Sequence, residues 1–249
     1  MKTWRRLLLL LSIWLALPAW AQTLTVAVDS SLSAAMPALA KSFEAGRPGV
    51  NVRLLPGTAG ALLEQVASGP GIDVLAGSDP ETASTGLIRR LLRPDLRSTF
   101  ASNTLVLVVP ASPRVAVVRL VDLSRPDVLR IAIGRQPSVP TGRFAREVIN
   151  GQRLWPLLQS KLVFAPDEAA VLALVIAGDT DAGFIYGSTA VGAGNRLRVV
   201  ETLVTALPLR HLAHVTTASA QPTLAEAFVT YLRSDGAQTE LQRLGFGPP

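Results

Sequence analysis

Hydroxyl-bearing and small residues gather where predicted strands lead into helices. The three junctions are Asp29-Ser30-Ser31, Gly57-Thr58-Ala59-Gly60 and Pro140-Thr141-Gly142. Junctions of this kind lie at the carboxyl ends of strands, where open α/β sheets bind ligands. The helix N-termini that follow have free N–H groups and about half a positive elementary charge, which suit an anion. The junctions therefore indicate a small anion site, although each set of residues could instead serve only as helix caps.

Other chemistries are poorly supported by the residue types present. The chain has no cysteine, which excludes thiol catalysis and Cys-ligated metals. No Gly-Lys-Ser/Thr follows Gly57, so this is not a nucleotide-binding loop. His211 and His214, three apart in a predicted strand, should point to opposite faces and need a third ligand to hold a metal. Ser31 has no Gly-x-Ser-x-Gly context. We therefore expect no enzyme, no cofactor and no direct metal-ligand site.

These junctions must be positioned by an alternation of strand-like and helix-like segments. Apolar runs predict the strands, and segments with helical periodicity predict the helices. The alternation is typical of an α/β protein with mostly parallel sheets. Residues 111–119 have both turn and strand character and stay unassigned. The strands are expected at 24–28, 50–55, 73–76, 105–109, 130–133, 161–164, 182–186, 197–200 and 211–215, and the helices at 33–45, 59–68, from about 80, 141–149, 167–177, 223–232 and 236–244.

Length and composition indicate a folded protein of one or two domains. The 249 residues are 49% hydrophobic and 17% charged, which disfavours disorder. No flexible linker or internal repeat is present, so a second domain would have to arise by the chain crossing over. Basic residues are scattered and never form a run of five or six, which argues against a nucleic-acid partner.

The first 21 residues read as a secretory signal peptide. A basic start, an apolar stretch from Leu7 to Pro18 and the Ala19-Trp20-Ala21 site predict export and cleavage after Ala21. The alternative, an uncleaved anchor, is weaker because the apolar run is shorter than the ~20 residues that span a bilayer. Cleavage removes three basic residues, so the net charge falls from +6 to +3.

A family resemblance becomes specific along the mature chain. It is carried, in order, by VAVDSSLSAAMPALAKSFE, GTAGALLEQVASGPGIDVLAGSD, SNTLVLVVP, LRIAIGRQPSVPTGRFARE, KLVFAPDEAAVLALVIAGDTDAGFIYGSTAV and YLRSDGAQTELQRLGFGPP. This run resembles the periplasmic molybdate-binding proteins of ABC transporters. The resemblance implies a two-lobed α/β fold of the second periplasmic-binding type, with lobes at 22–104 plus 207–249 and at 105–206. It also implies that an oxyanion is held between the lobes by N–H groups and hydroxyls, without a counter-charge.

The resemblance also implies site residues, some of which match the family and some of which do not. Ser31 matches the first binding serine, Tyr186 the binding tyrosine, and Thr141 a residue that offers its backbone N–H. Ala59 stands where the family has a second serine, which leaves Thr58 as the nearest hydroxyl. Glu168 replaces a valine that offers its N–H.

A further departure is Asp29, which replaces an alanine two residues before the first serine. With Glu168 it adds two carboxylates that would repel a dianion and change the ligand class, unless both are ordinary caps or first-turn acids that point to solvent. Arg135 and Arg143 could attract anions, although a solvated surface position is the simpler reading.

The function implied is a periplasmic solute receptor. It would bind a tetrahedral oxyanion, molybdate or tungstate, and deliver it as a monomer to an inner-membrane ABC permease. The alternatives are a binding protein for another anion or a small organic ligand, or an exported sensor or enzyme subunit of the same fold.

Overall fold

The computed structural model describes residues 22–69, 71–78 and 80–249. The predicted signal peptide, residues 1–21, lies outside the described residues. Within the described part of the chain, no helix is both long enough and apolar enough to cross a membrane.

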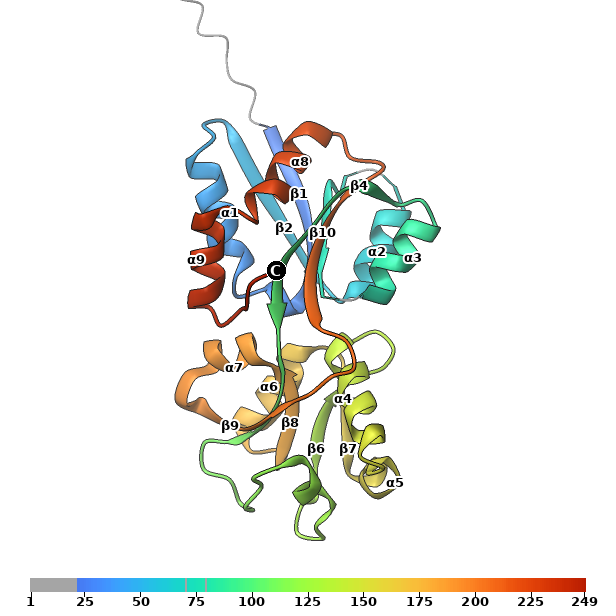
Figure 1. Ribbon diagram of the computed structural model, residues 1–249, viewed down its shortest axis with the longest axis vertical. Helices are drawn as coiled ribbons and strands as arrows, with labels where there is room; N and C mark the ends of the chain where they lie inside the picture. Colours follow the sequence, from blue (N-terminus) through green and yellow to red (C-terminus); the bar gives the residue numbers. More distant parts are fainter. Residues whose placement is uncertain (1–21, 70, 79) are drawn as a thin grey trace, which may run out of the picture.

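The first lobe is a five-stranded sheet covered by helices on both faces (Figure 1). In its inner strand β1 (Gln22–Asp29), Leu24, Val26 and Val28 pack on one face and Ala27 on the other, so both faces of the strand are buried. The strand order is β2 (Val50–Gly57), β1 (Gln22–Asp29), β3 (Val74–Gly77), β10 (Leu209–Thr216) and β4 (Leu92–Asn103). One face packs against α1 (Met36–Ala45), α8 (Pro222–Tyr231) and α9 (Asp235–Arg243), and the other against α2 (Ala59–Ala67) and α3 (Pro80–Ile88).

The second lobe repeats this plan with a second five-stranded sheet. Its strand order is β7 (Leu162–Ala165), β6 (Ile131–Gly134), β8 (Ala182–Tyr186), β5 (Leu105–Pro110) and β9 (Leu197–Leu203). Helices α4 (Pro140–Gly151) and α5 (Trp155–Leu158), with η2 (Leu120–Ser124), cover one face, and α6 (Glu168–Ala177) and α7 (Gly187–Ala193) cover the other. Short turns of 3-10 helix complete the lobes at η1 (Ser30–Leu32), η3 (Gln159–Lys161) and η4 (Gly194–Arg196).

The chain passes between the lobes twice, once from β4 to β5 at Thr104 and once from β9 to β10 through residues 204–208 (Figure 1). The two-lobed α/β class is therefore confirmed. The sheets, however, are mixed rather than mostly parallel, because two of the four neighbouring pairs in each sheet are antiparallel. All four antiparallel pairs involve the strands that lead into or out of the crossings.

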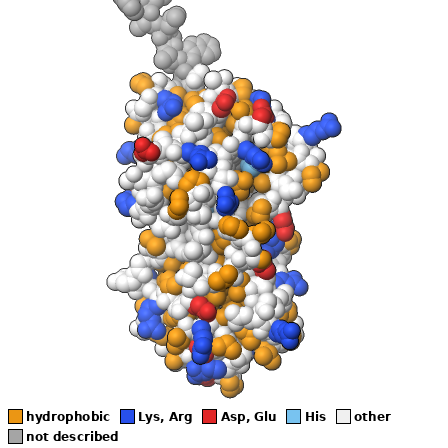
Figure 2. All heavy atoms as spheres, in the orientation of Figure 1, with side chains coloured by type: hydrophobic (Ala, Val, Ile, Leu, Met, Phe, Trp, Pro, Cys, Tyr) orange, Lys and Arg blue, Asp and Glu red, His pale blue; other side chains and the backbone are white. Residues whose placement is uncertain are grey.

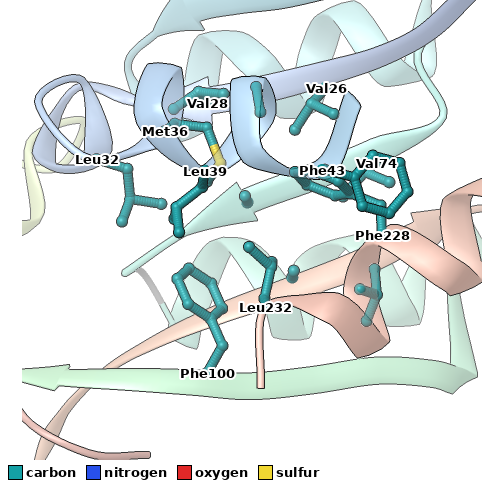
Figure 3. Close-up of a cluster of buried hydrophobic side chains, with 14 of the residues drawn as sticks. Val26, Val28, Leu32, Met36, Leu39, Phe43, Val74, Phe100, Phe228 and Leu232 are labelled. Carbon is teal, nitrogen blue, oxygen red and sulfur yellow. The ribbon is translucent and has the colours of Figure 1, made fainter. Parts of the chain in front are cut away.

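The largest core cluster joins the first and last elements of the described chain in the first lobe (Figure 3). Phe43 of α1 packs edge-on against Phe228 of α8, with ring centroids 5.0 Å apart. Phe100 of β4 and Leu232 lie in the same cluster and are fully buried. The C-terminal helices therefore belong to the first lobe although they follow the second lobe in the sequence.

Several elements differ from the sequence expectation, among them the short helix α5, which no predicted helix covers. The sequence pattern does not predict β4, because Arg93, Pro94 and Asp95 are unusual in a strand. β4 is the edge of its sheet, β10 is its neighbouring strand, and these three residues lie at a shift in register between the two. The short helix α7 consists of small residues without an apolar stripe and was missed. The predicted helix from residue 33 begins at Met36, after η1.

Candidate functional site

The predicted site residues all lie where strands of the two lobes end and helices begin. Ser31 lies in η1, directly after β1, and Thr58 and Ala59 begin α2. In the second lobe, Thr141 lies in the first turn of α4. Glu168 is the first residue of α6 and Tyr186 precedes α7. These ends of the two lobes face each other in Figure 1. The arrangement directs several helix N-termini toward the region between the lobes.

Two hydroxyl groups in this region are buried without a hydrogen-bond partner among the described residues. They are Ser31 Oγ, on a side chain 5% exposed, and Thr141 Oγ1, on a side chain 1% exposed. A buried hydroxyl without a partner destabilises a protein by about 1–3 kcal/mol. One comes from each lobe, so a ligand between the lobes could satisfy both. The resemblance implied only the backbone N–H of Thr141, and its hydroxyl is an additional candidate.

A hollow of about 200 Å³ lies between the lobes beside Ser31 and Glu168. The other predicted site residues, Thr58, Ala59, Thr141 and Tyr186, are not among those that line it. Both lobes contribute to its wall, and most of the polar groups are hydroxyls. Ser30, Ser31 and Ser33 line it from the first lobe, and Glu168, Ser188 and Thr189 from the second. The hollow is large enough for a small oxyanion.

Tyr186 connects the two lobes directly. Its side chain is 1% exposed, and its hydroxyl lies 2.8 Å from Ser78 Oγ of the first lobe. Ser78 was not among the predicted site residues. The signal that could have found it is its position immediately after β3, a strand-to-helix junction like those of Ser31 and Thr58.

The α2 junction supplies fewer polar groups. Thr58 is half-buried, and its side chain makes no capping hydrogen bond to the helix. Ala59 is buried and lines a small cavity inside the first lobe together with Asp29, Leu62 and His214. This junction can therefore offer a ligand the Thr58 hydroxyl and the first N–H groups of α2.

Asp29 is a cap, as one alternative held, but it does not point to solvent. Its Oδ1 accepts a hydrogen bond from the backbone N–H of Ser31 at 2.9 Å, which starts η1. The residue is only 2% exposed. The interpretation that Asp29 is solvated is therefore wrong, because the carboxylate is occupied in holding the turn that presents Ser31.

Glu168 is likewise a first-turn acid that is buried rather than solvated, being 3% exposed. Its Oε1 accepts a hydrogen bond from the Tyr186 N–H at 2.6 Å. Burial raises the pKa of this carboxyl to about 7, against the lowering effect of the hydrogen bonds from Tyr186 and Thr189. Asp29 and Asp167 raise this pKa further through like-charge repulsion. The expectation of a solvent-facing side chain is wrong here too.

Arg135 and Arg143 differ in their exposure to solvent. Arg143, whose side chain is 17% exposed, forms an ion pair between the lobes with Glu81 of α3, at 3.1 Å. Arg135 is exposed. The surface interpretation thus fits Arg135 but not Arg143. On the face shown in Figure 2, basic side chains are scattered over both lobes with acidic ones between them.

The two histidines lie on opposite faces of the first sheet, as their spacing predicts. The His211 ring contacts Phe246 at a centroid distance of 5.1 Å, whereas His214 lines the cavity beside Leu62 of α2. Burial lowers the pKa of His211 to about 3 and that of His214 to about 4, so both are neutral at pH 7. Within the described ranges, no three His, Asp or Glu side chains come together in a way that could hold a metal ion.

Two α/β lobes joined by two crossings, with a polar hollow between them, define a two-lobed binding protein. The chain belongs to the bacterial extracellular solute-binding protein family, whose model matches residues 24–247. It is therefore a solute-binding protein and not an enzyme.

Known proteins with similar sequences also match most of the chain. The chain is 30% identical to the molybdate-binding protein ModA of Mycobacterium tuberculosis, over 92% of this chain and 86% of that protein. It is 25% identical to the putative ABC transporter substrate-binding lipoprotein YvgL of Bacillus subtilis, over 90% of this chain and 86% of that protein. The resemblance to molybdate-binding proteins is thus confirmed.

Solved structures are also similar to this chain. The substrate-binding domain of a putative molybdenum ABC transporter from Clostridium difficile is 29% identical, with a TM-score of 0.73 over 91% of this chain and 99% of that chain. The sulfate-binding protein SubI of Mycobacterium tuberculosis has a TM-score of 0.80 over 91% of this chain and 87% of that chain. At 16% identity, this second likeness shows the fold alone.

Proposed function

We propose that this protein binds a tetrahedral oxyanion, molybdate or tungstate, between its lobes and delivers it to an inner-membrane ABC permease. In this proposal the protein is exported by a signal peptide cleaved after Ala21 and acts in the periplasm as a monomer. The oxyanion is the cargo, and no cofactor takes part. The ligand-binding residues are Ser31, Thr58, Ala59, Thr141, Glu168 and Tyr186.

The observation that carries this proposal is the pair of buried hydroxyls without partners, Ser31 and Thr141, one on each lobe. Hydrogen bonds to a charged group contribute about 1.5–3 kcal/mol each, so several such donors can offset the dehydration of an anion. Relatives named as molybdate-binding over most of this chain support the choice of oxyanion.

A thermal-shift panel on the mature protein tests the proposal. We expect molybdate and tungstate to raise the unfolding temperature, because a ligand at 100 times its Kd adds about 2.7 kcal/mol to the free energy of unfolding. Sulfate, phosphate and small organic acids complete the panel. No shift with molybdate or tungstate at millimolar concentration would contradict the proposed ligand.

A second ligand class is favoured by three particular residues. Ala59 lacks the hydroxyl that the family offers at this position, and Asp29 and Glu168 are both buried acids at the site. These residues are the observation that supports the alternative of another anion or a small organic ligand. A shift with phosphate or an organic acid in the same panel, and none with molybdate, would support this second class.

A further inference from the structure

Glu168 places a carboxyl group in the wall of the hollow that we propose as the ligand site. The side chain is 3% exposed and lines the hollow together with Ser31 and Ser188. Its Oε1 accepts the Tyr186 N–H, so the carboxyl is held in place by the end of β8. An anion between the lobes would therefore lie beside this carboxyl.

Few groups near Glu168 could neutralise its charge. The strands β5, β6 and β7, which pack against α6, contain no ionisable residue, and Glu168 is the one ionisable residue of α6 itself. β8 contributes the Tyr186 phenol. The charges that act on Glu168 are those of Asp29, from the first lobe, and Asp167, and both are negative.

The basic residue in the wall of the hollow is Arg196. It is exposed, and its Nε donates to the carbonyl oxygen of Ala193 at 3.1 Å. Because Arg196 is exposed, solvent screens its positive charge more strongly than it screens the negative charges of the buried acids. The buried side-chain charges around Glu168 are therefore negative before any ligand enters, and only the partial positive charge of the α6 N-terminus opposes them.

A dianion in the hollow adds further negative charge beside Glu168. Like charges close together in a buried site favour the protonated form of an acid, as in paired carboxylates that share a proton. Because burial already raises the pKa of Glu168 to about 7, protonation of this group in neutral solution requires little free energy. The neutral acid keeps Oε1 as an acceptor for the Tyr186 N–H.

Resting on the proposed function, we propose that oxyanion binding is coupled to the uptake of one proton by Glu168, so that the closed complex holds the anion beside a neutral carboxylic acid. The proton comes from solvent, and no covalent bond other than the carboxyl O–H forms. Glu168 is thus a positioning residue that makes the affinity for a dianion depend on pH.

Calorimetric titration of molybdate into the mature protein, in pairs of buffers with different ionisation enthalpies, measures this coupling. We expect little proton uptake near about pH 6, where Glu168 is already neutral, and uptake that approaches one proton per anion near about pH 8. The Kd should weaken by up to tenfold for each pH unit above about 7.

Two variants isolate the group responsible. Glu168→Gln keeps an oxygen that can accept the Tyr186 N–H but cannot ionise, so we expect binding without proton uptake and with a Kd independent of pH. Asp167→Asn is the matched control, because it removes a neighbouring carboxylate and keeps a side chain that can cap α6. In this control the proton uptake should remain.

Infrared difference spectra of the parent protein give a measurement that needs no variant to fold. At about pH 8, molybdate should convert one carboxylate band into a protonated carboxyl band. Binding with no proton uptake, or uptake that persists in Glu168→Gln, overturns this inference alone. No binding at any pH, in the parent and in Glu168→Gln, overturns the proposed function and this inference together.

Discussion

At the scale of the residue, the hydroxyls of Ser31 and Thr141 are buried and make no hydrogen bond within the described residues. They therefore do not stabilise the unliganded protein. We expect Ser31→Ala and Thr141→Val each to weaken molybdate binding by about ten- to a hundredfold, which is the loss of one hydrogen bond to a charged group. The free energy of unfolding without ligand should stay the same or rise, because each change removes a buried polar group without a partner. Titration calorimetry and denaturant unfolding measure the two effects; a large loss of unliganded stability would contradict the prediction.

Glu168 lowers the free energy of unfolding as pH rises, whereas most acids in folded proteins have the opposite effect. Its pKa is about 7 when folded and its ordinary value is 4.5, so the folded state binds more protons between these values. Stability from this group is therefore lost as pH rises from about 4.5 to 7, by about 3 kcal/mol in all. Glu168→Gln should remove this loss.

The measurement is the difference in unfolding free energy between Glu168→Gln and the parent protein at several pH values. This difference should grow from about pH 4.5 to 7 and then stay level. Taking the difference also cancels the contributions of His211 and His214, whose lowered pKa values destabilise both proteins alike as pH falls below about 6.5. A difference that does not change with pH would show that Glu168 is ionised like an exposed acid.

At the scale of the element, the close approach of α4 to β6 positions Thr141. A Cβ added at Gly142 would overlap the carbonyl oxygen of Gly134, whereas one added at Gly151, at the other end of α4, would meet open space. Gly142→Ala should therefore destabilise the protein by about 1–3 kcal/mol and weaken molybdate binding, because α4 must shift. Gly151→Ala is the matched control and should change binding little, with a gain of up to about 1 kcal/mol in stability. Equal effects of the two changes on binding would argue against this role of the α4 N-terminus.

At the scale of the whole molecule, the two crossings at Thr104 and at residues 204–208 permit the lobes to close as rigid bodies. The bonds from Tyr186 to Ser78 and from Arg143 to Glu81 span the gap between the lobes in this structure. X-ray scattering should show a smaller radius of gyration with saturating molybdate than without ligand. An unchanged radius, with binding demonstrated separately, would contradict hinge closure.

The sequence alone determined the fold class and the positions of the polar junctions. Strand runs such as Leu24 to Val28 and helix-period segments are local patterns, so the α/β class followed from them directly. The order of family-like segments pointed to a two-lobed binding protein. The edge strand β4 was missed because its Pro94 and charged residues are acceptable only where one side of the strand is unpaired, which depends on the rest of the sheet.

Only the tertiary structure decided which polar groups share one environment. Ser78 and Tyr186 are 108 residues apart in sequence and meet only because the two lobes face each other. The same holds for Asp29 and Glu168, which a local pattern describes equally well as solvated caps or as buried acids. Burial is a property of the packed molecule, and it sets whether a carboxyl group is ionised, because a low-dielectric surrounding disfavours the charge.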